Sequence, residues 1–213
     1  MIPVKVLAVR YLANASPALC RAFGVPTGYP SLGMLTTDCD DATYIALDAA
    51  TKAADVEVVY GHSFYAGAGN ASSPNAGEVI GILAGSTPGI VRSGMEAALS
   101  ALKRVGFQDV GVPCLAHTVS SCGSFLSQEA GVQEGTALAY LIAPPLESMY
   151  ALDAALKAAD VKLCKLYAPP SETNFGGGLL SGSQSACNAA CEAFLQAVAE
   201  VAQKPLGAEY GTR

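Results

Sequence analysis

Few residues of this chain could act as a catalytic base. Histidine occurs only at His62 and His117, and a hydroxyl or thiol lies near each, at Ser63, Ser120 and Cys122. Nucleophilic catalysis needs a base within hydrogen-bond reach of the nucleophile, commonly on a motif such as G-x-S-x-G. Neither histidine belongs to such a motif, so the sequence predicts no catalytic residue and no enzyme activity.

The cysteines are the next candidates, as metal ligands or as disulfides. They show no C-x-x-C spacing, and an odd number of them suits the reduced thiols of a cytosolic protein. Two of them share a helix face at i and i+4, which core packing explains at least as well as a metal does. We therefore expect small core residues, no metal site and no cofactor. The cysteines are Cys20, Cys39, Cys114, Cys122, Cys164, Cys187 and Cys191.

Composition excludes several classes of partner. The chain has 213 residues and a net charge of −6, and no cluster of Lys and Arg could neutralise phosphates, so nucleic-acid binding is not expected. It also lacks an apolar run of roughly 18 residues, the length of a membrane span. Charged residues make up 14% of the chain, against roughly 25% in an ordinary domain. We expect a cytoplasmic protein with surface buried between subunits.

One long motif occurs twice. ALDAATKAADV covers 46–56 and ALDAALKAADV covers 151–161, ten identities in eleven positions at a separation of 105. The similarity between the two copies extends beyond this motif, because Gly24 and Val25 of the first copy correspond to Gly131 and Val132 of the second. Two copies of one domain therefore lie in tandem, and the turn-forming stretch GFQDVGVP between them places the predicted domains at 1–107 and 108–213.

Each copy interleaves strands with helices, which predicts an α/β fold, an α+β sandwich with helices covering a mixed sheet. Ser16 and Asp40 or Asp41 are the expected helix caps. Alanine is so frequent in the repeated helix that we expect its face against a neighbouring subunit rather than in a deep core. Predicted strands are 4–10, 32–37, 56–60, 77–85, 115–119, 137–143, 161–167 and 178–180, and predicted helices are 16–24, 40–55, 88–105, 147–160 and 183–203.

Two long loops, at 61–76 and 168–178, occupy equivalent places in the copies. Both are rich in glycine and small polar residues, and loops of this length in a compact domain are usually functional or mobile. Phe64, Tyr65 and Phe175 lie in these loops. Their bulk could close over a ligand or an opening.

The repeated string A-L-D-A-A-x-K-A-A-D-V resembles the signature helix of bacterial microcompartment shell domains. SLGMLTTDCDDATY, EVVYGHSFYAGA and APPSETNF extend the match over nearly the whole chain, to the tandem-domain shell proteins of ethanolamine utilisation. This resemblance implies two circularly permuted shell domains per chain. It also implies a homotrimer of pseudohexagonal shape that tiles with other shell proteins in the compartment shell and carries a gated central pore for metabolites or cofactors.

The resemblance assigns roles to some residues. On physical grounds alone, Lys52 and Lys157 are solvated side chains paired with Asp48 and Asp153, but the resemblance implies that both lysines lie at the tile edge. It also implies that the two long loops line the pore, with Phe64 and Tyr65 as lining residues. A discrete oligomer that senses a metabolite is the alternative function, and it would form no sheets.

The resemblance further implies a site for a small amine such as ethanolamine, between the two domains. The candidate residues are Asp40, Glu78, Phe107 and Phe175. An ammonium group needs carboxylates, and aromatic faces can add a cation–π energy of roughly 0.5 to 2 kcal/mol. The residues alone leave an alternative open, in which Asp40 only caps its helix and Glu78 is solvated.

Overall fold

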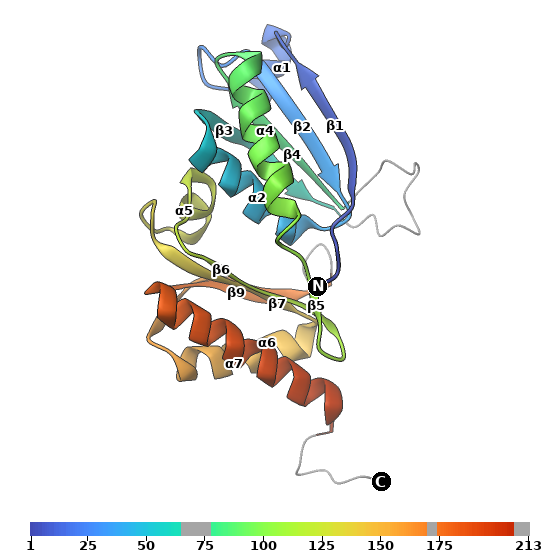
Figure 1. Ribbon diagram of the computed structural model, residues 1–213, viewed down its shortest axis with the longest axis vertical. Coiled ribbons are helices and arrows are strands. Elements are labelled where there is room, and N and C mark those ends of the chain that lie inside the picture. Colours follow the sequence, from blue (N-terminus) through green and yellow to red (C-terminus); the bar gives the residue numbers. More distant parts are fainter. Residues whose placement is uncertain (65–77, 170–173, 207–213) are drawn as a thin grey trace. The chain divides into compact units, whose positions relative to one another are not determined.

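The computed structural model in Figure 1 describes residues 1–64, 78–169 and 174–206, which belong to two compact units. The first unit contains Pro3–Gly106 and, from the second copy, Cys122–Gln128. The second unit contains Met1–Ile2, Phe107–Ser121 and the chain from Glu129. A short segment of the second repeat thus folds with the first repeat.

The first unit is a four-stranded antiparallel sheet in the order β1-β2-β4-β3, with α2 and α4 packed on one face (Figure 1). This packing is close, because a Cβ at Gly81 would lie 2.7 Å from the Leu47 side chain. The elements in chain order are β1 (Val6–Leu12), α1 (Pro17–Ala22), β2 (Ser31–Thr37), α2 (Asp40–Ala53), β3 (Val56–Ser63), β4 (Val79–Gly85) and α4 (Pro88–Leu102).

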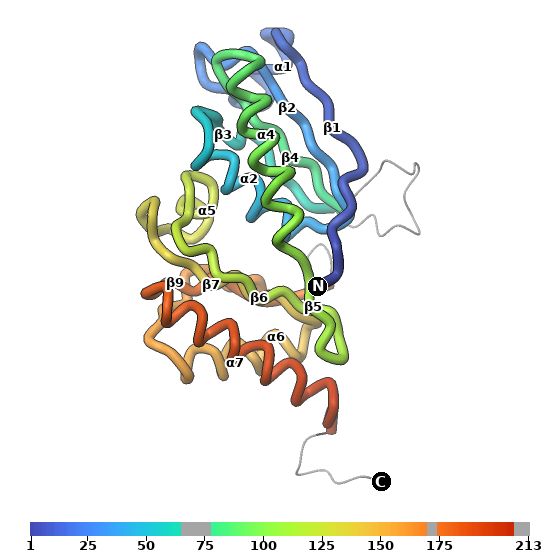
Figure 2. The backbone as a smooth tube through the Cα atoms, in the orientation of Figure 1, coloured from blue at the N-terminus to red at the C-terminus, as the bar shows by residue number. Residues whose placement is uncertain are grey.

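The second unit repeats this plan with one short strand added, in the order β5-β6-β7-β9-β8 and again antiparallel. Helices α6 and α7 lie side by side across one face of the sheet (Figures 1 and 2). Leu141, Leu180 and Phe194 are buried between them and the sheet. The elements are β5 (Gln108–Asp109), β6 (Pro113–Val119), α5 (Ser124–Ala130), β7 (Ala137–Ala143), α6 (Pro145–Ala158), β8 (Val161–Tyr167), β9 (Gly176–Gly182) and α7 (Gln184–Gln203).

Most predicted elements are present, with four differences. The sheets are antiparallel rather than mixed, and β5 and α5 were not predicted. Gly176–Gly178 form the start of β9 instead of the end of a loop. Glycine allows β9 to approach β7 closely here, because a Cβ at Gly177 would clash with the Leu141 backbone. Cys39, not an aspartate, occupies the N-cap of α2. Ser16 is the N-cap of α1 as predicted, although its side chain makes no capping hydrogen bond. Among the described residues, none of the helices could span a membrane.

Two alanines of each repeated helix lie in the core, whereas Ala53 and Ala158 of the same motif are exposed. Ala46, Ala50, Ala151 and Ala155 are all fully buried. Small side chains here allow α2 and α6 to approach their sheets and the neighbouring helices closely. Cys187 and Cys191 are also core residues, as predicted, and all seven cysteines are free thiols.

The two repeats also share loop geometry outside the signature helix. Gly24 and Gly131, which follow α1 and α5, have φ of 64° and 65°. Gly28 and Gly135, four residues on in each copy, have φ of 93° and 87°. Because positive φ at matched spacing is a specific backbone feature, α1 and α5 are equivalent elements, offset by 107 residues.

Candidate functional site

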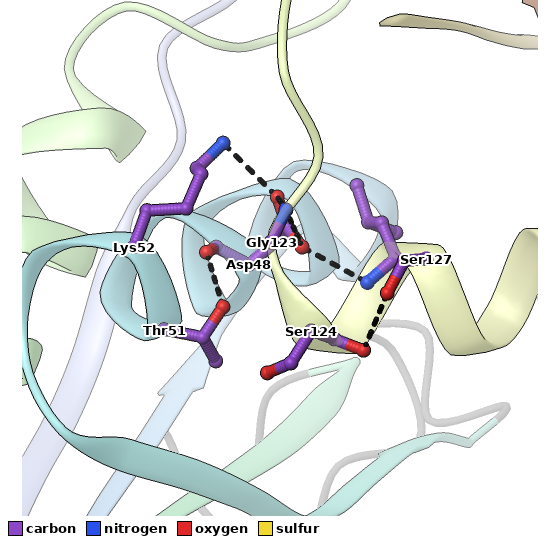
Figure 3. A network of polar contacts seen from close by, with 7 residues as sticks. Asp48, Thr51, Lys52, Gly123, Ser124 and Ser127 are labelled. Atoms are coloured by element: carbon purple, nitrogen blue, oxygen red, sulfur yellow. Dashed lines mark hydrogen bonds and ion pairs between the residues drawn. The ribbon is translucent and has the colours of Figure 1, made fainter. Parts of the chain in front are cut away.

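The aspartate of the first signature helix is the centre of a buried polar network (Figure 3). Asp48 has a fully buried side chain, and its carboxylate accepts hydrogen bonds from the backbone N–H of Gly123, at 2.8 and 2.9 Å, and of Leu126, at 2.9 Å. The Lys52 ammonium lies 3.0 Å from the same carboxylate. Asp48 therefore holds the segment Cys122–Gln128 against α2, and this segment is defined here as the α5 segment.

Glycine at position 123 is required by the closeness of this contact. A Cβ there would lie 2.8 Å from the Asp48 carbonyl oxygen, and the Thr51 hydroxyl would also block it. Further along the segment, the Phe125 ring lies over Gly61 of β3, with Tyr44 beside it at 6.0 Å between ring centroids. The α5 segment thus combines charge-assisted hydrogen bonds with aromatic packing.

The second signature helix carries the same aspartate and lysine in a different environment. The Asp153 carboxylate lies 2.5 Å from the Lys157 ammonium, and these side chains are 63% and 74% exposed. Lys52, by contrast, is 37% exposed beside its buried partner. Both lysines therefore form the predicted i,i+4 pairs, but within residues 1–64, 78–169 and 174–206 only the pair in α2 is covered by another segment.

Two of the predicted amine-binding residues lie close together at the start of α2 and β4. Burial raises the pKa of Asp40, although a hydrogen bond from the Ser63 hydroxyl opposes the shift. The pKa of Glu78 is raised first by its partial burial, then by the negative charges of Asp40 and Asp38. Tyr44 in turn shares a hydrogen bond with Ser63. These carboxylates are destabilised in their charged form, which is the electrostatic condition that a cation would relieve.

The two predicted aromatic residues form a pair in the second unit. Phe107 and Phe175 meet edge to face, with 5.5 Å between ring centroids and an interplanar angle of 74°. Phe64, a predicted pore residue, is half-buried, and its backbone N–H donates to the Glu78 carbonyl oxygen at 3.0 Å. Tyr65 lies outside the described residues, as do 66–77 and 170–173.

No catalytic or metal centre is assembled in the described part of the chain. His62 packs against Tyr60, with 5.8 Å between ring centroids, and none of the described His, Cys, Asp and Glu side chains gather in threes as a metal ion requires. Sequence reasoning missed Gly123 and Leu126, the partners of Asp48. Their local signal is a glycine and a serine between two predicted strands, which indicates a turn but not its long-range contact.

Comparison with known proteins identifies the fold. Residues 31–112 match the BMC domain family. The shell protein EutL of Clostridium perfringens is 58% identical over 97% of this chain and 98% of its own length, and EutL of Escherichia coli is 47% identical over 97% and 96%. The crystal structure of the ethanolamine utilization protein EutL from Leptotrichia buccalis superposes with a TM-score of 0.94 at 55% identity, covering 97% of each chain.

These matches confirm the resemblance noted in the signature helix and the shell-domain fold expected from it. They cover 97% of the chain, so they extend over both repeats and are not restricted to the duplicated motif. The family is one of structural proteins rather than enzymes. The chain belongs to the EutL family of bacterial microcompartment shell proteins.

Proposed function

We propose that this protein is a trimeric tile of a microcompartment shell, acting in ethanolamine utilisation. The observation that carries the proposal is the duplicated shell domain, since three chains with two repeats each supply the six positions of a hexagonal tile. Sedimentation should give a particle of three 21.6 kDa chains, and electron microscopy of concentrated protein should show flat sheets. A stable monomer at micromolar concentration would refute the tile, whereas trimers that never form sheets would favour a discrete metabolite sensor.

We propose that Lys52 and Lys157 act at the tile edge, in lateral contacts. Their matched places in α2 and α6 and their partial exposure support this role. Lys157→Asp should leave trimers intact and reduce sheet formation strongly, because the substitution exchanges an ammonium donor for a carboxylate. Lys162→Asp, at another exposed lysine of the same unit, is the matched control. Lys52 is better tested as Lys52→Gln, since an aspartate there would repel the buried Asp48.

The proposal includes a central pore, gated by loop rearrangement, with Phe64 as the described residue that borders it. Support comes from the position of Phe64 at the end of β3, where the long loop 65–77 begins. Phe64→Ala should raise the permeability of assembled shells to a small metabolite. Phe23→Ala, another half-buried phenylalanine of the first unit, controls for lost aromatic bulk. Equal permeability of all three proteins would remove Phe64 from the pore.

We propose that Asp40 and Glu78 bind a small ammonium compound such as ethanolamine, with Phe107 and Phe175 supplying aromatic faces. The raised pKa values of the two carboxylates support a cation there, because the cation would stabilise both charges. Calorimetry should detect ethanolamine binding to the parent and its loss in Asp40→Ala and Glu78→Ala, but not in the control Asp160→Ala. Binding that survives both substitutions would place the amine elsewhere.

A further inference from the structure

A chain of hydroxyl groups ends at Asp40, one of the carboxylates proposed to bind an amine. Asp40 and Tyr44 are four residues apart at the start of α2, so their side chains lie on one face of that helix. Ser63, the last residue of β3, donates to the Asp40 carboxylate and shares a second hydrogen bond with the Tyr44 hydroxyl. Ser63 and Asp40 are each 7% exposed. The three side chains therefore form one connected network that is largely shielded from water.

The hydrogen bonds of this network have only one possible direction while Asp40 is ionised. A carboxylate has no proton to give, so the Ser63 hydroxyl is the donor to Asp40. Ser63 has a single hydroxyl proton, and this bond uses it. The Tyr44 hydroxyl must then donate to the Ser63 oxygen. Both hydroxyl protons are thus directed along the chain toward the Asp40 charge, and hydrogen bonds in such a chain strengthen one another through polarisation.

Packing holds both hydroxyl groups in place. Ser63 is paired with Val79 in the ladder between β3 and β4, which fixes its backbone. The Tyr44 ring packs beside Phe125 over β3, because a Cβ at Gly61 would lie 3.5 Å from the Tyr44 ring and 3.3 Å from the Phe125 ring. The Tyr44 side chain therefore has little room to rotate away from Ser63, and the hydroxyl chain is formed before any ligand binds.

We propose that Ser63 and Tyr44 are positioning residues of the amine site, which hold Asp40 in its ionised form and fix the orientation of its carboxylate for a small ammonium compound. This inference rests on the proposed amine site and deepens it, by naming the residues that prepare its charge. An ammonium group is attracted to a carboxylate but not to a neutral carboxylic acid, so the affinity follows the ionised fraction of Asp40. Neither hydroxyl needs to contact the amine, since both act through Asp40.

The surroundings of Asp40 make this help necessary. The titratable groups packed around it are Cys39, Asp41, Asp38 and Glu78. None of the ion pairs in the described part of the chain includes Asp40. Burial raises the pKa of Asp40, and the Ser63 hydrogen bond is the largest of the interactions that lower it. Without that bond, Asp40 would keep only the weaker hydrogen bonds of its own turn of α2, and its charged form would be less favoured.

The pH dependence of ethanolamine binding tests the proposal, measured by calorimetry on the full chain. Ser63→Ala should raise the pKa of Asp40, so the pH at which half of the affinity is lost should rise by about one unit. Tyr44→Phe removes only the far donor and should shift this midpoint in the same direction by less. Ser63→Thr keeps a hydroxyl and should restore the parental profile. Tyr60→Phe removes a phenol hydroxyl elsewhere in β3 and is the matched control for Tyr44→Phe.

The outcomes separate this inference from the proposed amine site. If the parent binds no ethanolamine at any pH, the site and this role are both refuted. If the parent binds and Ser63→Ala keeps the parental midpoint, the site stands and the positioning role is wrong. An equal loss of affinity at every pH also overturns the role, because it would report lost shape rather than lost charge. Far-ultraviolet circular dichroism checks folding, and Tyr44→Phe, which keeps the ring beside Phe125, remains decisive should Ser63→Ala misfold.

Discussion

The two signature helices share ten of eleven residues, yet their aspartates lie in opposite environments. Asp48 is fully buried under three backbone hydrogen bonds and an ammonium group, whereas Asp153 has only the exposed Lys157 as a described partner. The sequence of the helix cannot cause this difference. It arises from the segment that covers one helix within the chain and leaves the other open. The tandem repeat thus displays, in one molecule, the same aspartate–lysine pair once buried and once exposed.

The largest contrast is expected between the two aspartates in the stability of the chain itself. Asp48→Ala leaves the N–H groups of Gly123 and Leu126 without their acceptor and should lower the free energy of unfolding by about 3 kcal/mol. Asp153→Ala, measured at concentrations where chains are dissociated, should change it by about 0.5 kcal/mol or less. Urea denaturation followed by circular dichroism gives both values. Equal losses would show that the two helices do not differ as described.

The next effect concerns the closeness of the covered contact. Gly123→Ala places a methyl group 2.8 Å from the Asp48 carbonyl oxygen and should cost about 1 to 3 kcal/mol of stability through overpacking. Gly89→Ala in α4 is the matched control, because the added methyl meets nothing closer than 3.9 Å. That control should stabilise the protein by about 0.5 kcal/mol. Thermal unfolding of both variants measures these changes in stability. A Gly123→Ala variant as stable as the parent would contradict the close approach of Gly123 to Asp48.

A third difference lies at the start of the two helices, where Asp40 has Pro145 as its counterpart. Burial raises the pKa of Asp40 in the folded chain, so the folded state binds its proton more tightly than the unfolded state. This contribution to stability is present at low pH and is lost as pH rises through the folded pKa. Asp40→Asn should therefore be more stable than the parent at pH 7, with an advantage that shrinks toward pH 4. A constant difference across that range would refute the electrostatic cause.

The smallest effect is expected for the exposed ion pair. Lys157→Ala removes a partner from Asp153 that is largely solvated, so the loss of stability should be about 0.5 kcal/mol or less. Lys52→Ala should cost more, because Asp48 is buried and keeps no other charged partner among the described residues of Figure 3. Urea denaturation of the two variants at high dilution compares them directly. A larger loss for Lys157→Ala would reverse the comparison.

Local sequence was sufficient for most of the fold and for the ion pairs. The i,i+4 spacing placed Lys52 beside Asp48 and Lys157 beside Asp153, and the periodicity of each repeat placed its helices and strands. The partners of Asp48 could not be predicted, because Gly123 is 75 residues away and its backbone N–H carries no residue-specific signal. The burial of Ala46 and Ala151 was also missed, since small side chains indicate close packing without indicating against which surface.

Amide hydrogen exchange at Leu126, compared in the parent and in Asp48→Ala, tests most directly whether Asp48 holds the α5 segment against α2. The Leu126 N–H donates to the buried Asp48 carboxylate, so it should be protected in the parent and should exchange much faster in Asp48→Ala. Leu19, the equivalent residue of α1 at an offset of 107, should exchange at the same rate in both proteins. Equal protection of Leu126 in the parent and in Asp48→Ala would contradict this account.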